Sequence, residues 1–151
     1  MDVVMPFQSG MATGLDSSFF AYGSTWEHGT TLNNAGPPTH QAGFFIHLDK
    51  YGNLLSGKYV GNWHTEYSVN ALRQLSNGNI AFYMRSNVAP FTSKLVCTDI
   101  NGNMVWATPL QVNDNELYKE ITTVNPVMQE LSNGNIMIAN EMTRNIDDTI
   151  F

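Results

Sequence analysis

The sequence has little charge and almost no cysteine. Charged residues make up 13% of its 151 positions, about half of the share that globular proteins usually carry. The only cysteine is Cys97, which excludes an internal disulfide framework and a cysteine-rich zinc site. Asparagine is abundant, yet no Asn-x-Ser/Thr sequon occurs, so the sequence gives no support for a glycosylated eukaryotic exterior.

Basic residues and long apolar runs are scarce as well. The seven lysines and arginines are scattered along a chain of net charge −6, so no basic stripe can neutralise a phosphate backbone, and we expect no nucleic-acid partner. No apolar run approaches the roughly 20 residues that cross a bilayer, which predicts no membrane span. The first basic residue is Lys50, so the N-terminus has no charged start of a signal peptide. Either the chain is not exported by that route or its true N-terminus lies upstream.

The residues that are present favour β-structure. Hydrophobic residues make up 42% of the chain and aromatic residues 11%, which is enough to build a core. Seventeen asparagines and twelve glycines point to many short turns between strands. Together these shares predict an all-β protein with a neutral, hydrogen-bonding surface.

One hexapeptide occurs twice. Residues 75–80 and 131–136 both read LSNGNI. Asn-Gly between two stretches of apolar alternation predicts a hairpin with a two-residue turn, in which both central residues tolerate positive φ. On either side, the alternation at period two predicts strands. The expected strands around the two turns are 71–75 with 80–85, and 127–131 with 136–139.

A second turn repeats at a similar interval. Residues 49–53 and 99–103 share the pattern Asp-x-x-Gly-Asn and are 50 positions apart, whereas the LSNGNI copies are 56 apart. A fainter third copy of the first turn begins at Leu15, where the Asn-Gly pair is missing. The repeating unit is therefore four strands: a hairpin across LSNGN, a variable loop, a hairpin across Asp-x-x-Gly-Asn and a second variable loop.

This unit predicts an all-β fold of repeated four-stranded antiparallel sheets, similar to the blades of a β-propeller. We expect one continuous repeat domain of about two and a half blades, although propellers close with at least four. Three alternatives follow: a fragment of a longer chain, which we favour, several copies that complete a ring, or strands packed as a sandwich or solenoid. The expected segments are an N-terminal segment 1–14, a first repeat 15–67, a second repeat 68–123 and a partial third repeat 124–151.

The second repeat resembles a known class of blade. It runs from Val96 through Asp99 and a glycine-containing turn to Trp106, and the next hairpin carries Leu-Ser-Asn-Gly-Asn-Ile. This order resembles the blades of the quinoprotein-like and arylsulfotransferase-like propellers, a kind of repeat also present in bacterial surface and phage tail proteins. The resemblance implies a propeller fold. In the sulfotransferase-like pattern a histidine commonly precedes the turn, where this chain has Gln74 and Glu130.

Function is expected at the end of the sheets opposite the short turns. Long loops on a rigid scaffold are common binding sites. Their aromatic and histidine side chains suit a sugar face or a protein partner, and the alternative is that the tryptophans simply cover the ends of the sheets. The long connections are 25–41, 61–67, 87–92 and 111–121. The candidate binding residues are Trp26, His28, Trp63, His64 and Tyr67.

Other chemistry has weaker support. The side chains that could by type bind a metal are Glu27, His28, His40 and His64. Their spacing is not that of a helix or a tight loop, so we expect no metal site and no cofactor. His47 shares a strand face with apolar residues and is expected in the core. Residues 99–103 space their oxygen atoms like half a calcium loop but lack the downstream glutamate, which favours a simple turn. No nucleophile motif, phosphate loop or catalytic carboxylate pair is found, so we expect no catalytic residues.

Two functions are compatible with these patterns. The favoured one is a non-enzymatic binding or structural scaffold module that recognises a glycan or a protein, as in an adhesin, a surface protein or a virion tail. The alternative is a fragment of a propeller enzyme of the sulfotransferase-like or quinoprotein-like type, with its catalytic residues in blades outside this sequence. The expected partners are a glycan or a protein, together with further copies of the chain or the remaining blades of a longer one. The favoured location is extracellular, at a cell surface or in a virion.

Overall fold

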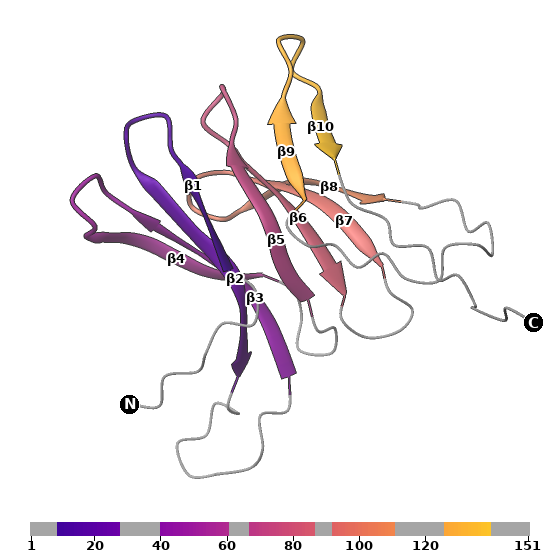
Figure 1. Cartoon of the computed structure of the whole chain (residues 1–151), viewed down its shortest axis with the longest axis horizontal. Helices are drawn as coiled ribbons and strands as arrows, with labels where there is room; N and C mark the ends of the chain where they lie inside the picture. The colour runs from indigo at the N-terminus through magenta and orange to yellow at the C-terminus, as the bar shows by residue number, and fades with distance from the viewer. Residues whose placement is uncertain (1–8, 28–39, 61–66, 87–91, 111–125, 140–151) are drawn as a thin grey trace, which may run out of the picture.

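The computed structural model describes residues 9–27, 40–60, 67–86, 92–110 and 126–139. All regular structure within these ranges is β-strand, which confirms the all-β prediction. Ten strands form three antiparallel sheets that follow one another along the chain, as Figure 1 shows. No helix in the described part of the chain is long and apolar enough to span a membrane.

Two of the sheets have four strands in sequential order, which confirms the four-strand unit. The first sheet contains β1 (Ser9–Thr13), β2 (Phe19–Glu27), β3 (His40–Leu48) and β4 (Leu54–Val60). The middle sheet contains β5 (Tyr67–Gln74), β6 (Ile80–Ser86), β7 (Ser93–Thr98) and β8 (Met104–Leu110). The third sheet is the hairpin of β9 (Val127–Glu130) and β10 (Ile136–Ala139). Strand β1 lies in the segment 1–14, for which the sequence predicted no strand.

The LSNGN hairpins have a different turn from the one predicted. The N–H of Leu75 donates to the carbonyl of Asn79 at 2.7 Å, and the N–H of Gly78 donates to the carbonyl of Leu75 at 2.8 Å. This is a three-residue loop, a type I turn followed by a bulge, and only Gly78 has positive φ, at 86°. The prediction of a two-residue turn was therefore wrong. The side chain of Asn77 accepts a hydrogen bond from the N–H of Asn79 and favours the type I turn.

The other described hairpin turns follow the same plan. The turns at residues 49–53, 99–103 and 131–135 have the same two backbone hydrogen bonds, each with glycine at the positive-φ position. In the first sheet the turn closes from Gly14 to Ser18 at 2.7 Å, and Ser17 takes the positive-φ position at 67°. The faint third copy in the sequence is thus the same turn, built without Asn-Gly.

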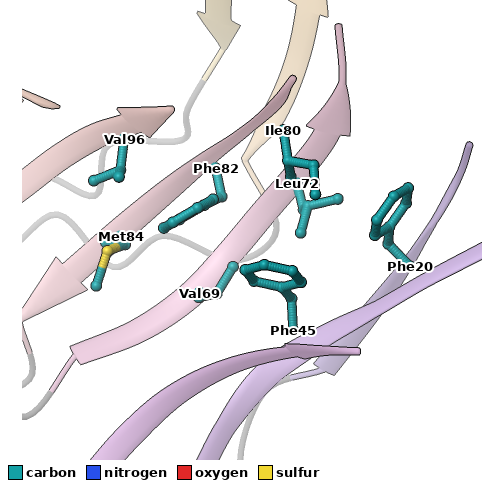
Figure 2. Packing of buried hydrophobic residues seen from close by; sticks show 8 residues of the cluster. All are labelled: Phe20, Phe45, Val69, Leu72, Ile80, Phe82, Met84 and Val96. Atoms are coloured by element: carbon teal, nitrogen blue, oxygen red, sulfur yellow. The ribbon is translucent and has the colours of Figure 1, made fainter. Parts of the chain in front are cut away.

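The first core lies between the first and middle sheets. Strand pairing places Ile80, Phe82 and Val96 on one face of the middle sheet, which we call its front face. Figure 2 shows these side chains in one cluster with Phe20 and Phe45 of the first sheet, and all five are buried. The ring centroids of Phe45 and Phe82 are 5.9 Å apart. Because burying one large apolar side chain contributes about 1.5–3 kcal/mol, this cluster holds the two sheets together.

The second core lies on the opposite face of the middle sheet, which we call its back face. Ala81, Tyr83 and Cys97 alternate with the front-face residues, and they are buried in a cluster with Met128 of β9. Ile138 of β10 packs half-buried against the same cluster. The middle sheet is therefore covered on both faces, which explains why β6 is buried almost throughout instead of alternating between buried and exposed.

Each interface also contains a polar contact between neighbouring hairpin turns. Gln74, just before the turn of the middle sheet, accepts a hydrogen bond from the N–H of Leu15 in the turn of the first sheet, at 2.8 Å. At the equivalent place in the third sheet, the carboxylate of Glu130 accepts hydrogen bonds from the N–H and the hydroxyl of Ser76, at 2.7 and 2.9 Å. We call this kind of contact, made by Gln74 at the first interface and by Glu130 at the second, the turn clamp. In each case a residue just before a hairpin turn accepts hydrogen bonds from the turn of the preceding sheet.

Candidate functional site

The short turns form a closed, internally bonded end of the sheets. One carboxylate oxygen of Asp99 accepts hydrogen bonds from the N–H groups of Asn101 and Asn103, at 2.9 and 2.8 Å, and the other accepts one from the Asn103 amide at 2.8 Å. Asp49 makes the same three contacts in the first sheet. The side chain and backbone of the asparagine four residues on hold the pKa of each aspartate below its ordinary value of 3.8. These bonds support the turn interpretation over a calcium loop.

The other end of the sheets collects the long connections. In the first sheet, pairing runs from Phe19 with Leu48 near the turns to Glu27 with His40 at the far end. In the middle sheet, the strand residue furthest from the turns is Tyr67, which pairs with Ser86. The chain therefore leaves and re-enters each sheet at the end opposite the turns, as the sequence predicted for this end.

The structure places two of the five predicted binding residues. Trp26 lies within β2, near its far end, and its backbone is opposite Gln41 of β3. Tyr67 is the first residue of β5. Both were predicted in loops and instead belong to the ends of strands, so their backbones are fixed by sheet pairing. The remaining predictions, His28, Trp63 and His64, lie outside the described residues.

Two of the residues weighed as metal ligands are neighbours in the first sheet. Strand pairing sets Glu27 of β2 opposite His40 of β3, at the end where the long connections begin. His28 and His64 lie outside the described residues. The described part of the chain contains no group of three or more histidine, cysteine, aspartate or glutamate side chains that could hold a metal ion.

A buried histidine–serine pair lies near the turn of the first sheet. The Nε2 atom of His47 is 2.9 Å from the hydroxyl oxygen of Ser18, and both residues are buried. The imidazole ring stacks on Phe20 with centroids 4.4 Å apart and an angle of 7° between the planes. The polar atom therefore has a partner while the ring extends the apolar core, which confirms the prediction that His47 is a core histidine.

Asp16 completes a Ser, His and Asp cluster that does not have the geometry of a catalytic triad. Its carboxylate accepts a hydrogen bond from the N–H of Ser18 at 3.1 Å, and hydrogen bonds from Ser18 hold the pKa of Asp16 below its ordinary value. In a triad the carboxylate orients the histidine, whereas here it binds the serine. The serine is also 2% exposed, which leaves no approach for a substrate. The cluster satisfies polar groups beneath a hairpin turn.

Two further reactive or aromatic side chains belong to the middle sheet. Cys97 is buried in the second core, and burial raises the pKa of its thiol, so the nucleophilic thiolate is disfavoured. Trp106 lies on β8 opposite Cys97, at the outer edge of the sheet, and is exposed. The edge strand β8 is exposed along most of its length, so its side chains contribute little to either core.

Sequence reasoning missed the two polar arrangements that organise the turn end. The partnership of Ser18 and His47 joins residues 29 positions apart and depends on the register of β2 and β3. The turn clamp had a visible signal, because Gln74 and Glu130 occupy the same place in two copies of the repeat. Both side chains carry an acceptor oxygen at the end of a two-carbon stem, which is the shared property that the clamp uses.

The chain matches no family model, and no curated protein matches it. The candidate site therefore depends on the geometry of this chain alone: a turn end whose polar groups bond to one another, and an opposite end that carries the long connections.

Proposed function

We propose that this chain is a non-enzymatic binding module in which sheets of the β-propeller blade type carry a ligand-binding end. Stacked four-stranded sheets in sequential order support the blade interpretation. Strand β5, the first of its sheet, packs against the neighbouring sheets on both sides, whereas the fourth strands β4 and β8 are largely exposed. Inner first strands and outer fourth strands are what a radial arrangement of blades requires.

The observation that carries the functional proposal is the contrast between the two ends of the sheets. At the turn end, the acceptor oxygens of Asp49 and Asp99 are bonded to groups within their own turns. At the far end, the sequence brings aromatic and histidine residues into the connections and the last strand positions. A rigid scaffold with variable connections at one end is a common arrangement for binding.

The chemistry of the far end suits a carbohydrate or a protein surface. Aromatic rings offer a flat apolar surface, and neighbouring polar groups provide hydrogen bonds that fix the orientation of the ligand. In this chain Trp63 and His64 are adjacent in sequence, and Tyr67 begins the strand that follows. An extracellular, cell-surface or virion setting would present such an end to glycans.

The proposal is tested by glycan-array binding of the wild type and of a Trp63→Ala/His64→Ala variant. We expect the variant to lose at least about 10-fold in affinity, because its aromatic platform is gone, while its melting temperature stays close to that of the wild type. Tyr51→Ala is the matched control, since Tyr51 is an exposed aromatic residue at the turn end. Equal loss in the control, absence of binding by the wild type, or unfolding of the double variant would overturn glycan binding at this end.

A further inference from the structure

The front face of the first sheet is apolar, and within the described residues no other sheet packs on it, so we call it open; Met11 is exposed there and the other side chains are half-buried. Most residues of β1, β2 and β3 on this face occupy places that are buried on the front of the middle sheet; the exception is Phe44, whose counterpart Lys94 is half-buried. Met11 is 68% exposed, whereas Leu72, at the equivalent place in the middle sheet, is 6% exposed. Neither described core cluster includes the side chains of this face. They are Met11, Phe19, Ala21, Phe44, Ile46 and Leu48.

The back face of the third sheet is open in the same way. Met137 is 49% exposed, whereas Ala81, at the equivalent place in the middle sheet, is fully buried. Val127 and Leu131 are also exposed on this hairpin. On the middle sheet the corresponding back-face residues form the second core with Met128.

These two open faces are the two halves of an interface that the chain already makes twice. The front of the middle sheet packs on the back of the first, and the front of the third packs on the back of the middle. We propose that the open front face of the first sheet binds the open back face of the third sheet in a second copy of this chain. The stacking within one molecule thereby continues into the next.

Such an interface joins unlike surfaces, head to tail. A heterologous contact closes into a ring if its rotation permits and otherwise extends as a filament. The proposed interface lacks the turn clamp of the two internal interfaces, because the first sheet has Thr13 at the position of Gln74 and Glu130. Across the proposed interface Thr13 would lie next to Ser132, which has the position of Ser76 in the third sheet. The apolar faces must therefore supply most of the association free energy.

The proposal is tested by sedimentation velocity of the whole chain up to about 1 mM, a range that detects weak association. Met11→Glu blocks the front face and Met137→Glu blocks the back face. Both side chains are exposed in the monomer, so folding should be kept, whereas an unpaired carboxylate buried in an apolar interface should weaken association at least about 100-fold. Val105→Glu is the matched control, because Val105 is an exposed apolar residue on the edge strand of the middle sheet.

The two blocked variants also provide a complementation test. Each is expected to be monomeric alone, because it has lost one of the two faces. An equimolar mixture should form dimers and nothing larger, since the intact back face of Met11→Glu meets the intact front face of Met137→Glu. Dimers in the mixture would also show that both variants are folded. A monomeric wild type, a control that dissociates like the blocked variants, or a mixture without dimers would overturn the proposal.

A gain-of-function variant sharpens the test. Thr13→Glu restores a carboxylate at the turn-clamp position, where it can accept hydrogen bonds from Ser132 of the next copy as Glu130 does from Ser76. We expect self-association to become about 5- to 10-fold tighter, and Thr13→Val to show no gain. Weaker association of Thr13→Glu than of the wild type would contradict the head-to-tail register.

Discussion

The first and middle sheets are built on one plan, and they differ in what covers them. The pairing of β1 to β4 repeats that of β5 to β8, including an irregularity just before the second turn in both, except that β5 has a bulge between Val69 and Ala71 that β1 lacks. Yet Ile80 is fully buried on the front of the middle sheet, whereas Phe19 at the same place in the first sheet is only half-buried. The comparison shows that a repeat fixes which side of a sheet a residue faces, while the neighbouring sheet decides its burial.

The largest expected difference in stability is between substitutions at Ile80 and at Phe19. Ile80→Ala should lower the free energy of unfolding by about 3 kcal/mol, because it removes a fully buried side chain and leaves a cavity. Phe19→Ala should cost less, about 1–2 kcal/mol, since its side chain is only half-buried in the folded protein. Urea denaturation of dilute protein measures both. Equal costs would mean that the front face of the first sheet is covered as well as that of the middle sheet.

A smaller difference is expected between the turns of the two sheets. Gly78→Ser should destabilise by about 1 kcal/mol, because a side chain at positive φ is strained. A Cβ atom on residue 78 would have no neighbouring atom within 4 Å, so the cost is that of the backbone alone. The reverse change, Ser17→Gly, relieves the same strain but adds freedom to the unfolded chain, so its gain should stay below about 1 kcal/mol. The melting temperatures of both variants measure these two effects. A Ser17→Gly variant that is less stable than the wild type would show that the serine side chain contributes more stability than its backbone strain removes.

The smallest effect is expected from acid, and it should be the same in both sheets. The folded-state pKa of Asp49 and of Asp99 lies below the ordinary 3.8 because of hydrogen bonds from Asn53 and Asn103. Each aspartate therefore contributes stability that is present above pH 3.8 and is lost as the pH falls through the lowered folded pKa. In Asp49→Asn and in Asp99→Asn, the free energy of unfolding should fall less steeply with decreasing pH than in the wild type, and to a similar extent in both. Chemical denaturation at several pH values measures this slope. A change in only one sheet would show that the two turns are not equivalent.

The sequence predicted the repeat well where local chemistry decides it. The hairpins around Gly78 and Gly134 and the second turns at 49–53 and 99–103 follow from turn residues and period-two alternation. Strand β1 was missed because Ser9–Thr13 carries few apolar residues and becomes a strand through its pairing with β2. The turn type was also missed, because a three-residue loop depends on the closing pair of Leu75 and Asn79, which strand register determines.

The candidate site was predictable in position more than in detail. Alternation of strands and short turns indicates which end carries the long connections, and pairing confirms that Trp26 and Tyr67 lie toward that end. Their assignment to loops was wrong, because sheet pairing extends β2 to Glu27 and begins β5 at Tyr67. The buried pair of Ser18 and His47 could not be foreseen, since it joins two strands through a register that no local pattern specifies.

By itself the sequence determined most of the strands, the position of the hairpins and the side of each sheet that a residue faces, because side chains alternate along a strand and Asn-Gly turns are local. Only the tertiary structure decided which faces are covered. Ile80 and Phe19 have the same place in the repeat and similar apolar character, and stacking on Phe20 and Phe45 buries one of them while the other stays partly open. The physical reason is that burial depends on a neighbouring sheet that is distant in sequence. Which faces are left open therefore follows only from how the sheets stack.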